Sequence, residues 1–263
     1  VRYMELKLAS SELDPDRTQD AQERVKVKEK MYKAVKRGVN KAKEQLAQNG
    51  FKQTVKFMYT AERHEAPMFS LEDSQLAVKW ANEPDSDFVA LDLAGDEVNF
   101  SVERHAAALN YAREHNLNIT CHAGETLYSE QLSNVESMKK SIKLGAKRIG
   151  HGLAVCNDPE LLKLVKENNI TIEVSPSSNI ATMSVKSWSD HPIRKMLDEG
   201  VNVALCSDDP AMFNTKITRE YERLYMHNLL NSWDEIKKLV MTGIMSSFAP
   251  ENEKQELAEE FKK

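Results

Sequence analysis

The sequence predicts an α/β fold, a (β/α)8 barrel of the TIM type with seven of its eight strands present in this chain and extra helices at the C-terminal end. Short β-prone runs alternate with helical patterns along all 263 residues. Most of these runs begin close to ~31 residues apart, the spacing obtained when a barrel of about 250 residues is divided into eight strand–helix units. Several runs, such as F-V-A-L-D-L-A, are apolar almost throughout, which is typical of parallel strands covered on both faces.

The predicted strands are rich in β-branched, aromatic and aliphatic residues. In chain order they are Tyr3–Ala9, Thr54–Thr60, Asp87–Ala94, Asn118–His122, Arg148–Leu153, Thr171–Ser175 and Asn202–Ser207. A closed barrel needs one more strand than these. Because the chain opens on Val1, already inside a strand-like pattern, we expect the polypeptide to begin before this residue.

Helical patterns fill the intervals between the strands and end at glycine, asparagine or proline signals. They are Thr18–Asn49, Ser70–Asn82, Ser101–Asn116, Ser133–Leu144, Asp158–Asn168 and Pro192–Glu199, followed by Thr218–Asn231, Ser232–Phe248 and Glu251–Phe261. Ser70 and Asp73 are predicted to form a capping box. No Pro/Gly-rich linker interrupts the series, so residues 1–263 are predicted to form a single barrel domain that is incomplete at its N-terminal end.

The composition is that of a globular protein with a sizeable core. Apolar residues make up 41% and charged residues 29% of the chain, and the formal net charge is −5. Because no basic surplus exists to neutralise phosphates, neither nucleic acid nor membrane is an expected partner. No apolar run approaches the ~20 residues that span a bilayer, and no signal peptide is apparent. The three cysteines do not indicate a disulfide framework, so a reducing, cytoplasmic location is expected.

Polar and reactive residues follow five of the predicted strands. In a parallel barrel the functional face lies at the carboxyl ends of the strands, so these residues are expected to converge. The segments are L-D-L-A-G-D-E (91–97), C-H-A-G-E (121–125), R-I-G-H-G (148–152), S-P-S-S-N (175–179) and S-D-D-P (207–210).

His122 and Asp208 are candidate metal ligands, because imidazole and carboxylate oxygen are the ligands of catalytic zinc. Successive side chains on a strand point to opposite faces, so Asp208 and Asp209 are expected to face different partners, with Pro210 holding Asp209 extended. The alternatives are an Asx-type turn for the two aspartates and a core position for His122.

Glu125 and His151 are candidates for acid–base chemistry. Glu125 lies just beyond His122 behind a glycine and is a possible general acid, or else a first-turn carboxylate that complements a helix dipole. His151 lies between Gly150 and Gly152, which allow a close approach of backbone and ligand. It suits a base or an orienter of a metal-bound water, the alternative being a buried histidine satisfied by backbone carbonyls.

The other histidines and the cysteines are mainly interpreted as structural. His64 is expected near the pocket rim, whereas the residues interpreted as packing or solvent-exposed are His105, His115, His191, His227, Cys121, Cys156 and Cys206.

With these motifs in this order, the chain resembles the adenosine deaminases, metal-dependent (β/α)8 hydrolases of the amidohydrolase type. The resemblance covers the chain essentially from end to end. It implies that His122 and Asp208 bind zinc, that Glu125 protonates purine N1 and that His151 orients and deprotonates the attacking water. It further implies that Gly95 and Asp209 contact the ring nitrogens.

The resemblance implies hydrolysis of adenosine, and of 2′-deoxyadenosine, to the inosine product and ammonia. The expected partner is a small purine nucleoside, and the oligomeric state is left open. The family's H-x-H pair, which supplies two further zinc ligands, is missing from this sequence. As printed, the chain is therefore expected to bind metal poorly. The alternatives are a non-catalytic purine-nucleoside-binding barrel and an amidohydrolase acting on adenine or a 5′-modified adenosine.

Overall fold

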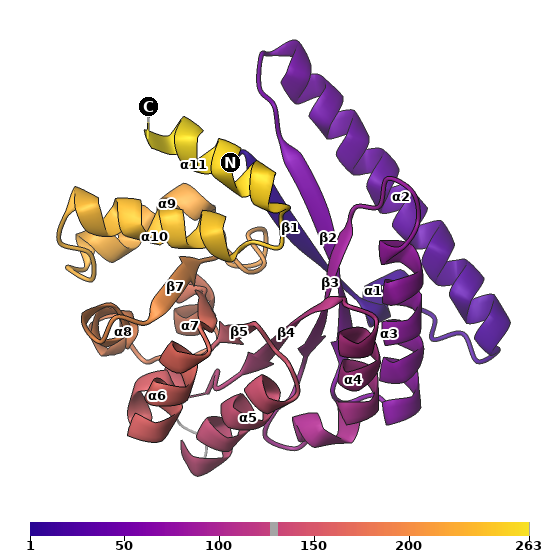
Figure 1. Cartoon of the computed structure of the whole chain (residues 1–263), viewed down its shortest axis with the longest axis horizontal. Coiled ribbons are helices and arrows are strands. Elements are labelled where there is room, and N and C mark those ends of the chain that lie inside the picture. The colour runs from indigo at the N-terminus through magenta and orange to yellow at the C-terminus, as the bar shows by residue number, and fades with distance from the viewer. Residues whose placement is uncertain (127–130, 263) are drawn as a thin grey trace. The chain divides into compact units, whose positions relative to one another are not determined.

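The computed structural model describes residues 1–126 and 131–262, without the side chains of 131–133. The chain divides into two compact units, one formed by residues 1–95 and 104–119 and the other by residues 96–103 and 120 onward. Both are built from parallel strands with helices between them (Figure 1). All seven predicted strands are present, and their order follows the chain. This is the strand–helix alternation of the predicted TIM-type barrel fold.

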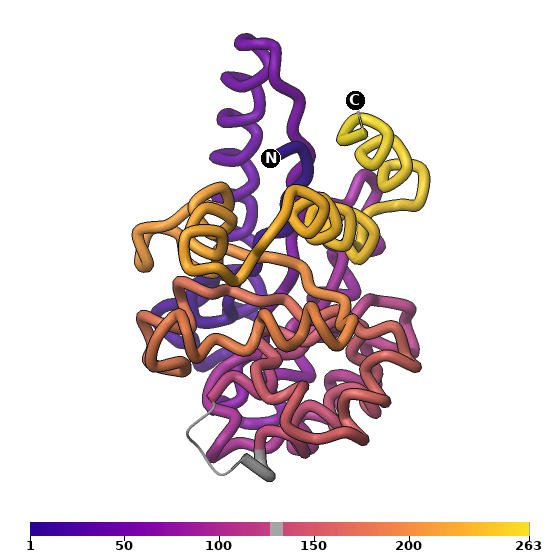
Figure 2. Tube along the Cα trace, turned by 90° about the vertical axis from the view of Figure 1, so that its left-hand side faces the viewer, coloured from indigo at the N-terminus to yellow at the C-terminus, as the bar shows by residue number. Residues whose placement is uncertain are grey.

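The first unit contains three complete strands and the helices that connect them. Its elements are β1 (Tyr3–Ala9), α1 (Ser10–Leu13), α2 (Ala21–Gln48), β2 (Thr54–Glu62), α3 (Pro67–Ala81), β3 (Phe88–Ala94) and α4 (Ala106–Glu114). The chain reverses direction between the 28-residue helix α2 and the strand β2 (Figure 2). The 3₁₀ helix η1 (Val102–His105) precedes α4 where the sequence predicted one continuous helix from Ser101.

An aromatic cluster forms the core between α2, α3 and the sheet of the first unit. Tyr32 stacks on Trp80 with ring centroids 4.9 Å apart, and Trp80 lies 5.0 Å from Phe88. Phe57 of β2 meets the edge of Tyr32 at 5.5 Å. All four side chains are buried. Each aromatic pair adds about 0.5–1.5 kcal/mol to the free energy gained by burying the rings, so this cluster holds both helices on the sheet.

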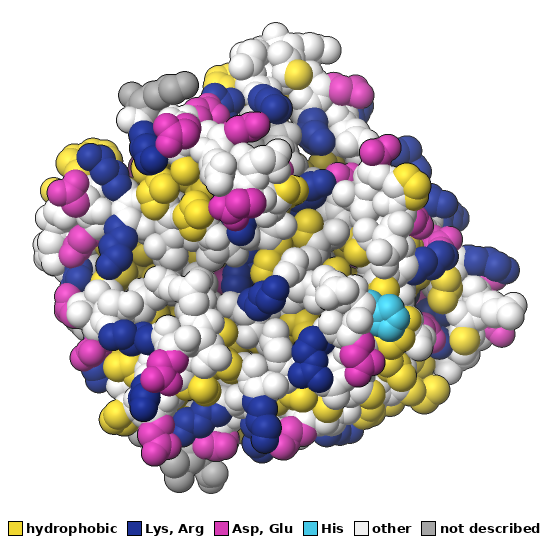
Figure 3. Space-filling model, viewed as in Figure 1, with side chains coloured by type: hydrophobic (Ala, Val, Ile, Leu, Met, Phe, Trp, Pro, Cys, Tyr) yellow, Lys and Arg dark blue, Asp and Glu magenta, His cyan; other side chains and the backbone are white. Residues whose placement is uncertain are grey.

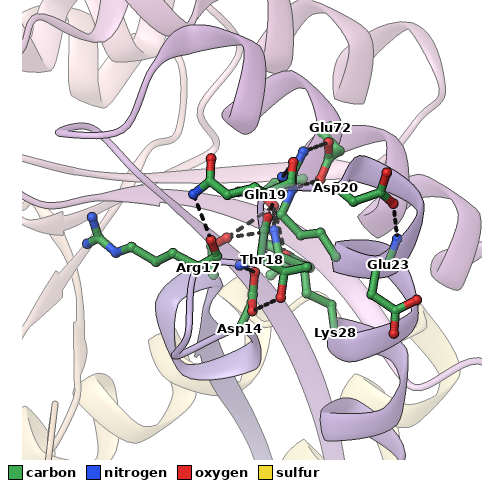
Figure 4. Close-up of polar contacts among 12 residues, drawn as sticks. Asp14, Arg17, Thr18, Gln19, Asp20, Glu23, Lys28 and Glu72 are labelled. Carbon is green, nitrogen blue, oxygen red and sulfur yellow. Dashed lines mark hydrogen bonds and ion pairs between the residues drawn. The ribbon is translucent and has the colours of Figure 1, made fainter.

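Helix α2 begins three residues later than the sequence predicted. Thr18 donates hydrogen bonds from its backbone N–H (2.8 Å) and its hydroxyl (2.9 Å) to the Asp14 carboxylate, which holds it outside the helix. Asp20 then caps α2 by accepting the backbone N–H of Glu23 at 2.8 Å (Figure 4). An aspartate at the N-cap satisfies one of the free N–H groups of the first turn, so the helix begins at Ala21.

The predicted capping box of Ser70 and Asp73 is wrong. Helix α3 begins earlier, at Pro67, because proline is well suited to the first helical position. Ser70 therefore lies inside the helix, where its hydroxyl is bonded to the Pro67 carbonyl and lies 2.8 Å from Nδ1 of His105. Asp73 points into the core of the unit.

The second unit contains the remaining strands and the C-terminal helices. Its elements are β4 (Asn118–Ala123, from residue 120 on), α5 (Gln131–Lys143), β5 (Arg148–His151), η2 (Leu153–Asn157), α6 (Pro159–Glu167), β6 (Thr171–Val174), α7 (Pro176–Ala181), η3 (Trp188–Asp190), α8 (Ile193–Asp198), β7 (Asn202–Leu205), α9 (Ile217–Met226), α10 (Trp233–Ser246) and α11 (Glu251–Lys262).

Strands β5 and β6 are buried at every residue, as predicted for parallel strands covered on both faces. β5 stops at His151 rather than Leu153 because Gly152 adopts a left-handed conformation with φ of 54°. The segment S-P-S-S-N is not a strand end beyond Ser175, since Pro176 starts the short helix α7. Among the described residues, no helix is long and apolar enough to cross a membrane. Basic and acidic side chains are interspersed over the face drawn in Figure 3.

Candidate active site

Four predicted site residues lie together at one end of the second unit. His122 is the next-to-last residue of strand β4, and Glu125 follows that strand. His151 is the final residue of β5, and Asp208 lies beyond the end of β7. β4, β5, β6 and β7 are parallel, so their carboxyl ends meet at the same edge of the sheet.

His151 is the centre of this group. Its Nε2 lies 3.8 Å from Oε2 of Glu125 and 3.8 Å from Oδ2 of Asp208. Its ring centroid is 5.2 Å from that of His122. The His151 side chain is only 6% exposed, whereas the two carboxylates are 32% and 24% exposed. The His122 imidazole and two partly exposed carboxylates therefore lie around the buried His151 ring.

Glycines next to His151 make room for this arrangement. The β4–β5 register sets Gly150 opposite His122, and a Cβ on Gly150 would lie 3.2 Å from Cγ of that imidazole. A Cβ on Gly152 would meet the Ile172 side chain at 2.7 Å. A Cβ at either position would crowd a neighbouring side chain, and the close approach of a ligand stays a prediction.

The expected strand alternation does not decide how Asp208 and Asp209 are oriented. β7 ends at Leu205, and Asp208 has φ of 53°, in the left-handed region that few residues other than glycine adopt. His151 also has a positive φ, of 61°. Such backbone conformations cost on the order of 1–3 kcal/mol and cluster at functional sites. Asp209 is exposed next to Asp208.

Gly95 belongs to the first unit and has φ of 93°. A Cβ there would lie 3.4 Å from the Arg63 backbone nitrogen and 3.5 Å from Nδ1 of His64. His64 itself is 39% exposed and lies 3.6 Å from a carboxylate oxygen of Glu65. Gly95 is thus required by the local backbone, and its expected contact with a ring nitrogen stays a prediction.

Sequence reasoning missed a role for Glu97, the last residue of L-D-L-A-G-D-E. Its carboxylate accepts the backbone N–H of Gly124 at 2.8 Å and that of Glu125 at 2.7 Å. Hydrogen bonds to a charged acceptor contribute about 1.5–3 kcal/mol each. Glu97 therefore holds the turn that carries Glu125, and its place at the end of a motif was the one signal of it.

Sequence reasoning placed Asn179 in the polar segment S-P-S-S-N but gave no role to it or to His191. Nδ2 of Asn179 lies 3.1 Å from Nδ1 of His151, and Oδ1 of Asn179 lies 3.3 Å from Nε2 of His191. Asn179 is fully buried, and His191 is 3% exposed. His191 packs inside the unit, as one of its two sequence interpretations held, but it also hydrogen-bonds to the group behind His151.

The remaining histidines make structural contacts. Nδ1 of His105 lies 2.8 Å from the Ser70 hydroxyl, and its Nε2 lies 3.0 Å from the Arg63 carbonyl. His115 stacks on Tyr111, and His227 stacks on Trp188. Of the cysteines, Cys121 is buried as predicted, and the other two are half-buried.

Burial lowers the pKa of His191 from 6.5 to about 4. Between about pH 6.5 and pH 4, this histidine is protonated in the unfolded chain but stays neutral in the folded protein. The free energy of unfolding is therefore expected to decrease by about 3 kcal/mol as the pH falls through this range. His191→Gln is expected to show a shallower pH dependence of urea unfolding over this range. His105, whose pKa burial also lowers, contributes equally to both proteins. Parallel curves for the two proteins would contradict this prediction.

His122 and Asp208 offer the donor types that zinc accepts, and both border His151. Within residues 1–126 and 131–262, however, no group of three or more histidine, cysteine, aspartate and glutamate side chains is arranged to hold a metal ion. The described residues thus do not form a complete metal site, and zinc binding by His122 and Asp208 stays a prediction.

Comparison with known proteins identifies the family. The family model for adenosine deaminase matches residues 1–263. The chain belongs to the adenosine deaminase family. Adenosine deaminase of Clostridium kluyveri is 40% identical over 174 residues, which are 66% of this chain and 48% of that protein. This family member spans about half the length of the curated adenosine deaminases that it matches.

Solved structures share the fold of this adenosine deaminase family member. The apo N6-methyl-AMP deaminase of Arabidopsis thaliana superposes with a TM-score of 0.82 and 25% identity, covering 100% of this chain and 72% of that one. A Burkholderia ambifaria amidohydrolase solved with bound zinc gives a TM-score of 0.78 at 19% identity, covering 100% of this chain and 68% of that one. The second likeness concerns the fold alone.

Proposed function

We propose that this chain carries out hydrolytic deamination of adenosine, and of 2′-deoxyadenosine, at C6 of the purine. The observation that supports this most directly is the convergence of His122, Glu125, His151 and Asp208 at the carboxyl ends of parallel strands. Family membership supplies the substrate class. In the reaction, the oxygen of water bonds to C6 and N1 takes up one proton. The C6–N bond then breaks as the second proton of the water leaves with the amino group as ammonia.

Each residue has a distinct part in this proposal. Glu125, held by Glu97, gives its proton to N1 and makes C6 more electrophilic. His151, buried at the centre of the group, orients the attacking water. Asp209 contacts a ring nitrogen.

We further propose zinc as the cofactor, with His122 and Asp208 among its ligands. Bound zinc lowers the pKa of water to near 7 and so supplies a nucleophile at neutral pH. A Burkholderia ambifaria amidohydrolase of the same fold was solved with bound zinc, which is consistent with a metal cofactor.

The intact protein is expected to contain about one zinc per chain and to release ammonia from adenosine. His122→Ala is expected to lose most of the zinc, measured by atomic emission after dialysis, because it removes a ligand. His115→Ala is the matched control, since that imidazole stacks on Tyr111. Intact protein with neither zinc nor ammonia release would reject the proposal.

A substrate series separates the proposed activity from the alternatives. The similarity in fold to an N6-methyl-AMP deaminase makes a 5′-phosphorylated purine the second candidate. Adenosine, adenine and N6-methyl-AMP are therefore compared at equal concentration. The proposal requires the largest kcat/KM for adenosine, and a larger value for either other compound would replace it.

A further inference from the structure

Behind His151, on the side away from Glu125 and Asp208, lies a chain of buried polar groups. It runs from the backbone N–H of Ile193 through the His191 ring and the Asn179 amide to Nδ1 of His151. The three contacts are 3.2, 3.3 and 3.1 Å long. All of these residues are in the second unit.

The direction of this chain is set by its first member, because a backbone N–H can only donate. Ile193 donates to Nδ1 of His191, so that nitrogen carries no proton and the ring is neutral. The ring proton of a neutral His191 must then be on Nε2. Burial, which lowers the pKa of His191 to about 4, agrees with a neutral ring at neutral pH.

The orientation of the Asn179 amide follows from this. Nε2–H of His191 needs an acceptor, so the atom that faces it is the carbonyl oxygen Oδ1 of Asn179. The amide nitrogen Nδ2 then faces His151 and donates to Nδ1 of that ring. A nitrogen that accepts this hydrogen bond carries no proton, so the proton of neutral His151 is on Nε2.

We propose that Asn179 and His191 are positioning residues that hold His151 in the tautomer protonated at Nε2. Nε2 is the atom that lies 3.8 Å from both Glu125 and Asp208. The resting imidazole therefore presents a donor to the site, suited to orienting an oxygen. This inference rests on the proposed function for its catalytic meaning, but the tautomer itself is independent of any substrate.

The test is two-bond ¹H–¹⁵N correlation spectroscopy of the intact, ¹⁵N-histidine-labelled protein at neutral pH. His151→Gln assigns the His151 signals by their disappearance. The wild-type ring is expected to show a pyrrole-type Nε2 and a pyridine-type Nδ1. A pyridine-type Nε2 with a pyrrole-type Nδ1 in the wild type would overturn the proposal without any variant.

Asn179→Asp is the sharpest variant, since it keeps the shape but replaces the donor by a carboxylate acceptor. Nδ1 of His151 is expected to gain a proton and change from pyridine-type to pyrrole-type, and kcat to fall about 10- to 100-fold with KM little changed. Asn168→Asp, at the exposed end of α6, is the matched control. An unchanged Nδ1 signal in folded Asn179→Asp protein would also overturn the proposal.

His191→Gln and His191→Leu test the part of the hydrogen-bonded chain that lies beyond Asn179. The glutamine amide can still donate to Oδ1 of Asn179 and is expected to keep the Nε2–H signature, whereas leucine is expected to lose it. Equal spectra for the two would contradict a role for His191. Absence of ammonia release from adenosine would reject the proposed function and leave the tautomer measurement standing.

Discussion

Glu125→Gln is expected to lower adenosine deamination by about 10³-fold or more while leaving the thermal unfolding midpoint unchanged. Glutamine has the shape of glutamate but cannot give a proton to N1, and general acid catalysis contributes about 10²–10⁴-fold. The backbone of residue 125 would still be held by Glu97, since that contact involves the N–H and not the side chain. Steady-state ammonia release and calorimetry of the intact protein measure the two quantities.

One control variant makes the Glu125 result specific. Glu167→Gln, at an exposed glutamate that pairs with Lys163 at 3.8 Å, makes the same chemical change on helix α6. It is expected to leave activity and stability as in the wild type. Retention of more than about a tenth of wild-type kcat by Glu125→Gln would exclude this residue as the acid.

Lys28→Met is expected to destabilise the protein by about 3–5 kcal/mol, because it leaves a buried carboxylate without its positive partner. Nζ of Lys28 lies 2.6 Å from Asp73, and both side chains are 3% exposed. Asp73 also accepts hydrogen bonds from Tyr59 (2.8 Å) and Ser10 (3.2 Å). For a chain of this size, the loss corresponds to a decrease of the unfolding midpoint by about 10 °C.

The pH dependence of the Lys28→Met effect identifies its cause. Burial raises the pKa of Asp73, and Lys28 opposes that shift. Without Lys28 the pKa is expected to rise further, so the variant regains stability relative to the wild type as the pH falls and Asp73 is protonated. Lys28→Met/Asp73→Asn, which removes the charge, is expected to recover part of the loss at neutral pH.

Lys26→Met is the matched control for Lys28→Met. Lys26 lies on the same helix and pairs with Glu23 at 3.2 Å, but the two side chains are 69% and 57% exposed. Exposed ion pairs contribute about 0–1 kcal/mol, so this change is expected to have little effect. If both lysine variants lost the same free energy of unfolding, the buried pair would contribute no more to stability than the exposed one.

Local signals in the sequence predicted the elements well and their ends less well. Strand β1 has its predicted bounds, Tyr3–Ala9. Helix α2 was predicted from Thr18 but begins at Ala21, since Thr18 is bonded to Asp14. The predicted pair of Ser70 and Asp73 failed because Asp73 contacts groups that are distant in the sequence, such as Lys28.

The sequence by itself determined the alternation of strands and helices and the types of side chain at the strand ends. Both are recorded in periodicity and in short motifs, and His122, Glu125, His151 and Asp208 were found that way. The tertiary structure alone decided which buried or partly buried groups hydrogen-bond to them. Glu97 accepts the backbone N–H of Glu125, and Asn179 connects His151 to His191. These contacts join segments that are far apart in the chain, and their distances depend on how strands and helices pack, which no local pattern records.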